Sequence, residues 1–136
     1  MNPEDFLEIV KVDGVLLAFV FRQGKLPDKS CFVTPDEANF QMGFVVHSEG
    51  AEVKRHAHQP VTREIVGTAE VAMVRSGRCE VDVYDTKHEF VRTIELSTGD
   101  TMLLLAGGHG FRMLEDTVLM EIKQGPYVES EDKINF

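Results

Sequence analysis

Residues 79–84, Cys-Glu-Val-Asp-Val-Tyr, decide the fold class of this 136-residue chain. Cys79, Val81 and Val83 alternate with polar or amphipathic neighbours, so an extended backbone would turn one face to a core and the other to water. Residues 118–123 repeat this alternation near the end of the chain. A period of two predicts β-strands in both places.

Working outward, similar short segments separated by turn residues recur along the chain, at residues 6–12, 15–22, 40–47, 51–58, 70–75, 90–96 and 101–105. Asp13-Gly14 between the first two is a strong hairpin signal. Residues 23–39, with two prolines, are typical of a long connection. About nine strands at this spacing, with almost no helix, predict a single all-β domain built as a sandwich or a barrel.

Composition limits the classes of partner and compartment. Hydrophobic residues make up 43% and charged residues 27%, the balance of a folded protein. A net charge of −9 with scattered basic residues argues against a nucleic-acid partner. The acidic start lacks the features of a signal peptide, and the most apolar stretch, residues 14–21, is too short to span a bilayer. We therefore expect a cytoplasmic protein whose two cysteines, Cys31 and Cys79, stay reduced; the alternative is a disulfide between them.

Two of the five histidines form the sequence His56-Ala-His58 within a segment expected to be extended. Side chains at positions i and i+2 of a strand share one face, with α-carbons roughly 6.5–7 Å apart. Two imidazoles at that separation can bind one cation through bonds of about 2.0–2.1 Å. The alternative is that both are solvated residues near a loop.

The surroundings of the pair follow a recognisable spacing. Gly50 lies six positions before His56, and Glu70 is followed by six residues and then Gly77. The pattern Gly-x5-His-x-His, followed by Glu-x6-Gly, resembles the first motif of the cupin superfamily. Eleven residues separate His58 from Glu70, where the family usually has three or four.

A second stretch resembles the other cupin motif, Gly-x5-Pro-x-Gly-x2-His-x3-Asn. Here Gly99 and Gly107 precede His109, while Leu105 stands at the proline position and Met113 at the asparagine position. The stretch is also one residue short before His109. The resemblance implies a jelly-roll (double-stranded β-helix) barrel over residues 40–127. Residues 1–39 would belong to the same domain, and residues 128–136 would form a tail.

The resemblance also implies a divalent metal held by His56, His58 and His109, with or without Glu70 as a fourth ligand. Fe, Mn, Ni, Co and Zn all suit such a set, and the sequence does not choose among them. Glu64 is the alternative carboxylate, but only Glu70 keeps the six-residue spacing to a glycine.

Further residues are candidates for a pocket beside the metal, although each also fits a surface or packing role. The apolar candidates are Phe44, Val46, Phe111 and Met113, and the polar ones are Gln41, Arg63, Arg112 and Tyr127. Strict alternation would turn Arg112 away from His109. His47 and Glu70 are the candidates for moving a proton, and His88 is expected at the surface.

The end of the chain, with Gly107-Gly-His-Gly-Phe111 and later Gln124-Gly-Pro-Tyr127, is similar to small cupins associated with polysaccharide assembly. That similarity implies a sugar or sugar-nucleotide substrate. The leading hypothesis is a metal-dependent enzyme that isomerises a small polar molecule. The alternatives are an Fe- or Ni-dependent dioxygenase and a non-catalytic metal- and ligand-binding module. The family also implies a homodimer, with residues 7–21 as the expected partner surface.

Overall fold

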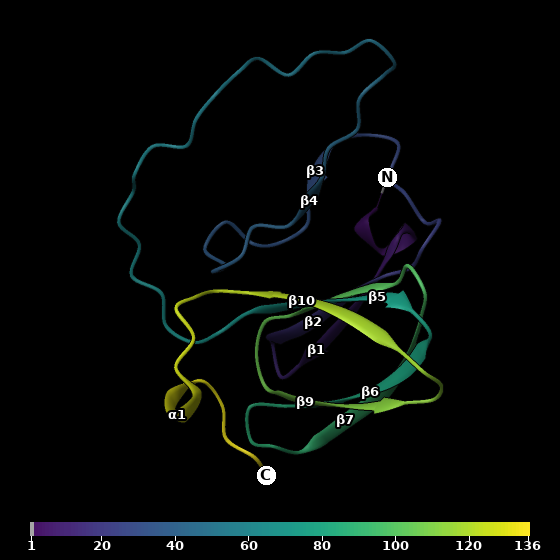
Figure 1. Cartoon of the computed structure of the whole chain (residues 1–136), viewed down its shortest axis with the longest axis vertical. Coiled ribbons are helices and arrows are strands. Elements are labelled where there is room, and N and C mark those ends of the chain that lie inside the picture. Colours follow the sequence, from purple (N-terminus) through teal and green to yellow (C-terminus); the bar gives the residue numbers. More distant parts are fainter. Residues whose placement is uncertain (1) are drawn as a thin grey trace. The chain divides into compact units, whose positions relative to one another are not determined.

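The structure is a computed structural model that describes residues 2–136, and it confirms the all-β prediction. The described residues form ten strands, labelled in Figure 1: β1 (Leu7–Val12), β2 (Val15–Phe21), β3 (Cys31–Phe32), β4 (Gly43–Phe44), β5 (Glu70–Ser76), β6 (Arg78–Tyr84), β7 (Phe90–Ser97), β8 (Thr101–Leu104), β9 (Gly108–Met113) and β10 (Val118–Lys123). The helices are η1 (Pro3–Asp5) and α1 (Glu129–Asp132). Neither of these described helices has the length that a membrane crossing requires.

The chain divides into two compact units. One contains residues 27–67, and the other joins residues 2–26 to residues 68–136. The larger unit holds eight of the strands and is called the sandwich unit below; the smaller holds β3 and β4 and is called the connecting unit.

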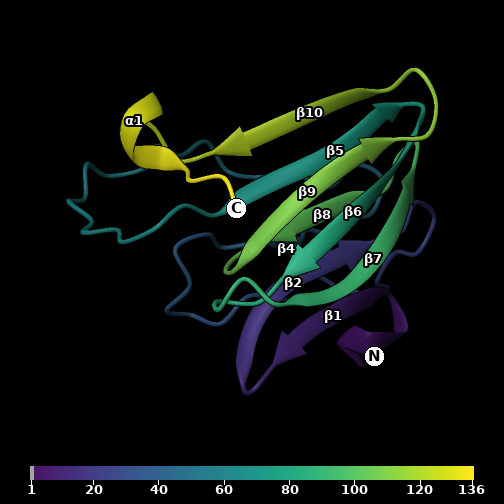
Figure 2. The same cartoon turned by 90° about the horizontal axis from the view of Figure 1, so that it is seen from below.

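Two antiparallel sheets build the sandwich unit. One has five strands in the order β1-β2-β8-β5-β10, and the other has three in the order β7-β6-β9. The two sheets are seen most easily in Figure 2. Neither closes on itself, since β1 and β10 end one sheet and β7 and β9 end the other. The observed architecture is thus an open sandwich of two sheets and not a closed barrel.

An apolar core lies between the sheets. It is formed by Val10, Leu17, Ala18, Val20, Val74, Met102 and Leu104 of the five-stranded sheet and by Cys79, Val81, Val83, Ile94 and Leu96 of the three-stranded sheet. The alternation read from residues 79–84 is confirmed, because each odd-numbered residue there is buried. Burying side chains of this size contributes about 1.5–3 kcal/mol each, which makes the core the main source of stability.

The predicted N-terminal hairpin is present. Val12 pairs with Val15, and the two residues between them have positive φ, 50° at Asp13 and 80° at Gly14. Positive φ at both positions is what a tight hairpin turn with the twist of its strands requires. The apolar run in β2 is buried within the chain from Leu17 to Phe21. Those residues therefore serve this chain's own fold, and the expected homodimer stays a prediction.

The connecting unit differs from the sequence prediction. The strand expected at residues 40–47 is reduced to β4, which pairs with β3, and the strand expected at residues 51–58 is wrong: that segment is exposed and outside every described strand. Hydrogen bonds join the segments on either side of it to other residues of the connecting unit. Val46 N donates to Ser30 Oγ at 2.8 Å, and Asn39 Nδ2 donates to the carbonyl of Val66 at 2.8 Å.

Both cysteines are free, as the sequence predicted. Cys79 is fully buried in the core, and its burial raises the pKa of the thiol. Cys31 is half-buried in β3.

Candidate metal-binding site

Glu70 and His109 meet between the two sheets of the sandwich unit. Glu70 opens β5, two residues before the buried Ala72 and on the same face of the sheet. His109 lies on β9 opposite the buried Val83 of β6, so it too points to the interior. Their side chains are 13% and 30% exposed, respectively, and Glu70 Oε1 lies 3.6 Å from His109 Nε2. The site is therefore accessible at the rim of the core.

The electrostatics of the pair favour a carboxylate over a carboxylic acid. The interaction with His109 lowers the pKa of Glu70, against the opposing effect of partial burial. The positive charges of Lys123 and Lys133 act in the same direction as His109. Glu70 is accordingly ionised at neutral pH and can serve as an oxygen ligand or as a base.

His56 and His58 form a second pair, within the connecting unit. Their ring centroids lie 5.5 Å apart, with the ring planes at 78°. His56 Nδ1 lies 2.9 Å from the carbonyl oxygen of Lys54. A carbonyl oxygen only accepts, so Nδ1 carries the proton of this hydrogen bond. In the neutral ring that tautomer leaves the lone pair of Nε2 for a metal.

The predicted ligands thus fall into two pairs, one in each unit. Within neither unit of the described chain do three or more His, Cys, Asp or Glu side chains gather as a metal site. Of the remaining candidates, Glu64 and His47 are exposed residues of the connecting unit, and His88 is exposed at the β6–β7 turn.

The structure separates the pocket candidates by role. Phe111 lies on the inner face of β9, and its ring meets that of His109 edge to face at 5.6 Å. Arg112 points away, as expected, and pairs with Glu80 and Asp82 on the outer face. The side-chain amide of Gln41 donates to three nearby carbonyls, so it stabilises a loop.

The other candidates occupy varied positions. Val46, Met113 and Tyr127 are 42%, 47% and 54% exposed, Arg63 is exposed, and Phe44 is half-buried in β4.

Sequence reasoning missed the two lysines beside Glu70. Lys123 ends β10, directly opposite Glu70 in the pairing of β10 with β5. Alternation predicts the strand β10, but its partner strand lies almost fifty positions earlier in the chain and has no local signal. Lys133 lies in the last segment, which has no recognisable pattern.

Comparison with models of protein families, with curated proteins and with solved structures found no match to this chain. Its function must therefore be argued from the residues and their geometry.

Proposed function

We propose that the protein is a metal-dependent cupin that acts on a small polar molecule of sugar or sugar-nucleotide type, by isomerisation or a related step. His56, His58 and His109 would hold a divalent cation, with Glu70 as the fourth ligand. The observation that carries the proposal is the approach of Glu70 to His109 at the rim of the core. A carboxylate and an imidazole placed there from opposite sheets are the kind of ligands that such metals take.

The separation of the two groups fits a shared cation. Two atoms each about 2.1 Å from one metal lie about 3.0–3.4 Å apart when their bonds meet at octahedral or tetrahedral angles. Glu70 Oε1 and His109 Nε2 lie 3.6 Å apart, so only a small adjustment would be needed. A pair held only by its own charges would gain from closer contact.

The His56–His58 pair supports the other half of the proposed site. The carbonyl of Lys54 fixes the tautomer of His56, which is the usual arrangement behind a metal-binding imidazole. The donor set of three imidazoles and one carboxylate fits the proposed group.

Strand connectivity supports the cupin assignment. The chain passes repeatedly between the two sheets: β5 lies in the first, β6 and β7 in the second, β8 in the first, β9 in the second and β10 in the first. Eight strands shared between two antiparallel sheets in this way are typical of a jelly roll, the architecture of cupins.

The chemistry would be divided between the cation and the chain. When bound, the cation would act as a Lewis acid on a carbonyl or hydroxyl oxygen of the substrate. Phe111 would supply an apolar wall beside His109. Glu70, where it does not bind the cation, or His47 would move the proton between adjacent carbons.

Titration of the metal-free protein with Co²⁺, followed by its visible absorption, tests the ligand set. We expect one bound ion per chain, and at least about tenfold weaker binding in His109→Ala and in His56→Ala. His88→Ala is the matched control, because it removes an imidazole from the β6–β7 turn. Equal Co²⁺ binding by wild type and His109→Ala would refute the proposed site.

Two further measurements test the reaction class. One is the identity of the metal in protein purified from its native source, and the other is turnover of candidate substrates. Isomerisation of a sugar nucleotide that stops on metal removal supports the proposal. Iron with substrate-dependent O₂ consumption would indicate a dioxygenase instead, and tight ligand binding without turnover would indicate a binding module.

We also propose that the protein is a homodimer and that it is cytoplasmic. Sedimentation at micromolar concentration tests the oligomeric state, and a monomer at that concentration would contradict the dimer.

A further inference from the structure

The edge strand β10 carries a row of apolar side chains that the described chain leaves exposed. β10 pairs with β5 on one side and with no described strand on the other. Figure 2 shows it at the margin of the five-stranded sheet, beside β5. Val118, Met120 and Ile122 alternate along it and are 59%, 40% and 51% exposed. An exposed apolar row on a strand with unpaired backbone N–H and C=O groups is a template for pairing with another strand.

The register of β10 places this row on the outer face of the sheet. Met120 lies opposite Met73 of β5, and Ile122 lies opposite Val71. Both β5 residues are half-buried and alternate with Val74, which belongs to the core between the sheets. They therefore point outward, and so do the β10 residues that face them. The outer face is apolar across both strands at this margin.

The other edge strands of the sandwich unit have features that discourage pairing. β1 contains Lys11, where its register with β2 shifts. β7 carries Arg92 and Glu95, and β9 carries Arg112, each of them in an ion pair. Charges and irregular register commonly prevent edge-to-edge association. The register shift of β10 follows its first residue and leaves the rest of the strand regular.

The charges of β10 are complementary to those of a second, antiparallel copy of the same strand. In a twofold-symmetric pair centred on Ile122, Glu121 of each copy lies opposite Lys123 of the partner subunit, so the attraction occurs twice. Both residues are exposed. Lys123 Nζ also lies 5.3 Å from the centroid of the Tyr127 ring, and an ammonium group has further donors for a carboxylate. A pair centred on Glu121 would instead set two glutamates against each other.

We propose that two copies of this chain associate through β10, by antiparallel pairing of the two edges centred on Ile122. The pairing would join the two five-stranded sheets into one and cover the apolar row. This inference rests on the homodimer of the proposed function and specifies its surface; it does not depend on the metal centre. It moves the interface away from residues 7–21, because the fold itself buries residues 17–21.

Sedimentation equilibrium of the full chain at micromolar concentrations tests the interface. We expect a dimeric wild type and at least about tenfold weaker association of Ile122→Arg, since two arginines would stand opposite each other at the centre of the pair. Ile9→Arg is the matched control, because Ile9 is a 39% exposed isoleucine on β1, the other edge of the same sheet. This control should dimerise like wild type, and circular dichroism should show the same strand content in all three proteins.

Exchange of the two charges tests the register without changing the apolar row. Glu121→Lys and Lys123→Glu should each weaken self-association at least about tenfold, because each variant sets like charges opposite one another twice. A mixture of the two variants should associate like wild type, because opposite charges then face each other again. The double variant that carries both substitutions should do the same.

The outcomes separate this inference from the rest of the proposed function. A monomeric wild type would overturn the β10 interface and the homodimer together. A dimer that persists in Ile122→Arg would overturn the β10 interface and leave the homodimer standing, and one lost in Ile9→Arg would place the interface on β1. A mixture of the charge variants that stays monomeric would overturn the register centred on Ile122. Titration of Ile122→Arg with Co²⁺ should give the same binding per chain as wild type, so the metal centre is judged independently.

Discussion

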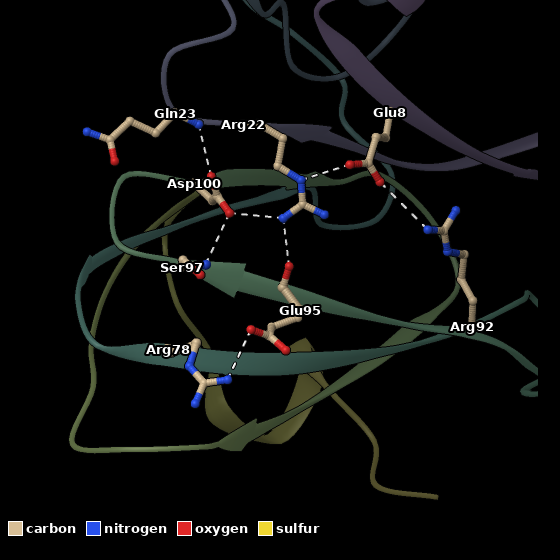
Figure 3. Close-up of polar contacts among 8 residues, drawn as sticks. All are labelled: Glu8, Arg22, Gln23, Arg78, Arg92, Glu95, Ser97 and Asp100. Carbon is tan, nitrogen blue, oxygen red and sulfur yellow. Dashed lines mark hydrogen bonds and ion pairs between the residues drawn. The ribbon is translucent and has the colours of Figure 1, made fainter.

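The two ends of β8 each place a carboxylate against a basic side chain, but with very different contacts. Asp100 directly precedes β8, and Glu70 pairs with Leu104 at the other end of the strand. Asp100 belongs to a dense network (Figure 3). Its carboxylate accepts hydrogen bonds from Gln23 N at 2.9 Å, Arg22 Nη1 at 2.9 Å and Ser97 N at 3.1 Å. The carboxylate of Glu70, by contrast, meets His109 only at 3.6 Å.

Arg22 extends the network at the Asp100 end across the sandwich. Its guanidinium also donates to Glu8 Oε1 at 2.8 Å and to the carbonyl of Glu95 at 2.6 Å, so it joins β1, β2 and β7. Two further arginines contact the same glutamates: Arg92 Nη2 lies 3.6 Å from Glu8 Oε2, and Arg78 Nη1 donates to Glu95 Oε1 at 3.1 Å. Figure 3 shows Arg22 at the centre of these contacts.

The lengths of these contacts indicate which role each charged pair has. The Asp100 carboxylate accepts three hydrogen bonds of 2.9–3.1 Å, so its charge stabilises the fold and has little capacity left for a ligand. At the Glu70 end the side chains are about as exposed as at the Asp100 end, but Glu70 approaches His109 only to 3.6 Å, so loss of this contact should cost the fold little. A binding role is the better explanation for such a pair.

The largest expected effect is at the Asp100 end. Arg22→Met would leave Asp100, whose side chain is 10% exposed, without its cation, and we expect a loss of about 2–4 kcal/mol in the free energy of unfolding. Urea denaturation measures it. Arg112→Met, which removes an arginine from an exposed pair, should leave the midpoint unchanged. A midpoint equally unchanged in Arg22→Met would remove the contrast between the ends.

Addition of metal should stabilise the protein through the Glu70 end of β8 and not through the Asp100 end. If Zn²⁺ binds as proposed, a free concentration of 100 times its Kd should raise the free energy of unfolding by about 2.7 kcal/mol. His109→Ala should abolish that gain, whereas Arg22→Met should show the same gain from its lower starting value. Thermal denaturation of the three proteins with and without Zn²⁺ makes the comparison. A gain that survives in His109→Ala would place the ion elsewhere.

The pH dependence of stability should include a contribution from Asp100. Burial raises the pKa of this group, but the hydrogen bonds from Gln23, Ser97 and Arg22 outweigh it and leave the pKa lowered. A lowered folded-state pKa means that the stabilisation is present above the unfolded-state pKa, near 4, and is lost as the pH falls through the folded-state value.

Urea denaturation from pH 6 to pH 2 would measure this effect. Asp100→Asn should be less stable than wild type at pH 6, by less than Arg22→Met, and the difference should shrink as the pH falls. A constant difference would mean that the Asp100 charge is not responsible.

Much of the sandwich unit was predictable from sequence because its signals are local. The Asp13-Gly14 turn fixes a hairpin, and the alternation at residues 79–84 fixes which side of β6 is buried. Residues 51–58 lacked such a signal. Their alternate positions are charged or small, and the one large apolar side chain, Val53, is 63% exposed. A segment that is extended but has no apolar face buries nothing on pairing, so its sequence does not determine which strand it pairs with.

The candidate site shows the same limit. The spacing of His56 and His58 predicted two imidazoles on one face of a strand; the strand is absent, and the two ring centroids lie 5.5 Å apart in an exposed segment. The approach of Glu70 to His109 was anticipated only through the cupin motifs, since it depends on two strands from different sheets. The position of Lys123 opposite Glu70 could not be found, because it depends on the pairing of β10 with β5.

Glu70→Gln should change the free energy of unfolding least of the variants at the two ends of β8, and it tests directly whether these ends differ in role. Glu70→Gln keeps the shape of the side chain and removes its charge, at a contact of 3.6 Å that is partly open to water. A contact of this length is longer than a hydrogen bond, so the free energy of unfolding at pH 7 should fall by less than about 1 kcal/mol. The variant should nevertheless bind Co²⁺ more weakly than wild type, as loss of a ligand oxygen requires. A large loss of stability with unchanged Co²⁺ binding would make Glu70 a second structural carboxylate, equivalent to Asp100, and the distinction between the two ends of β8 would no longer hold.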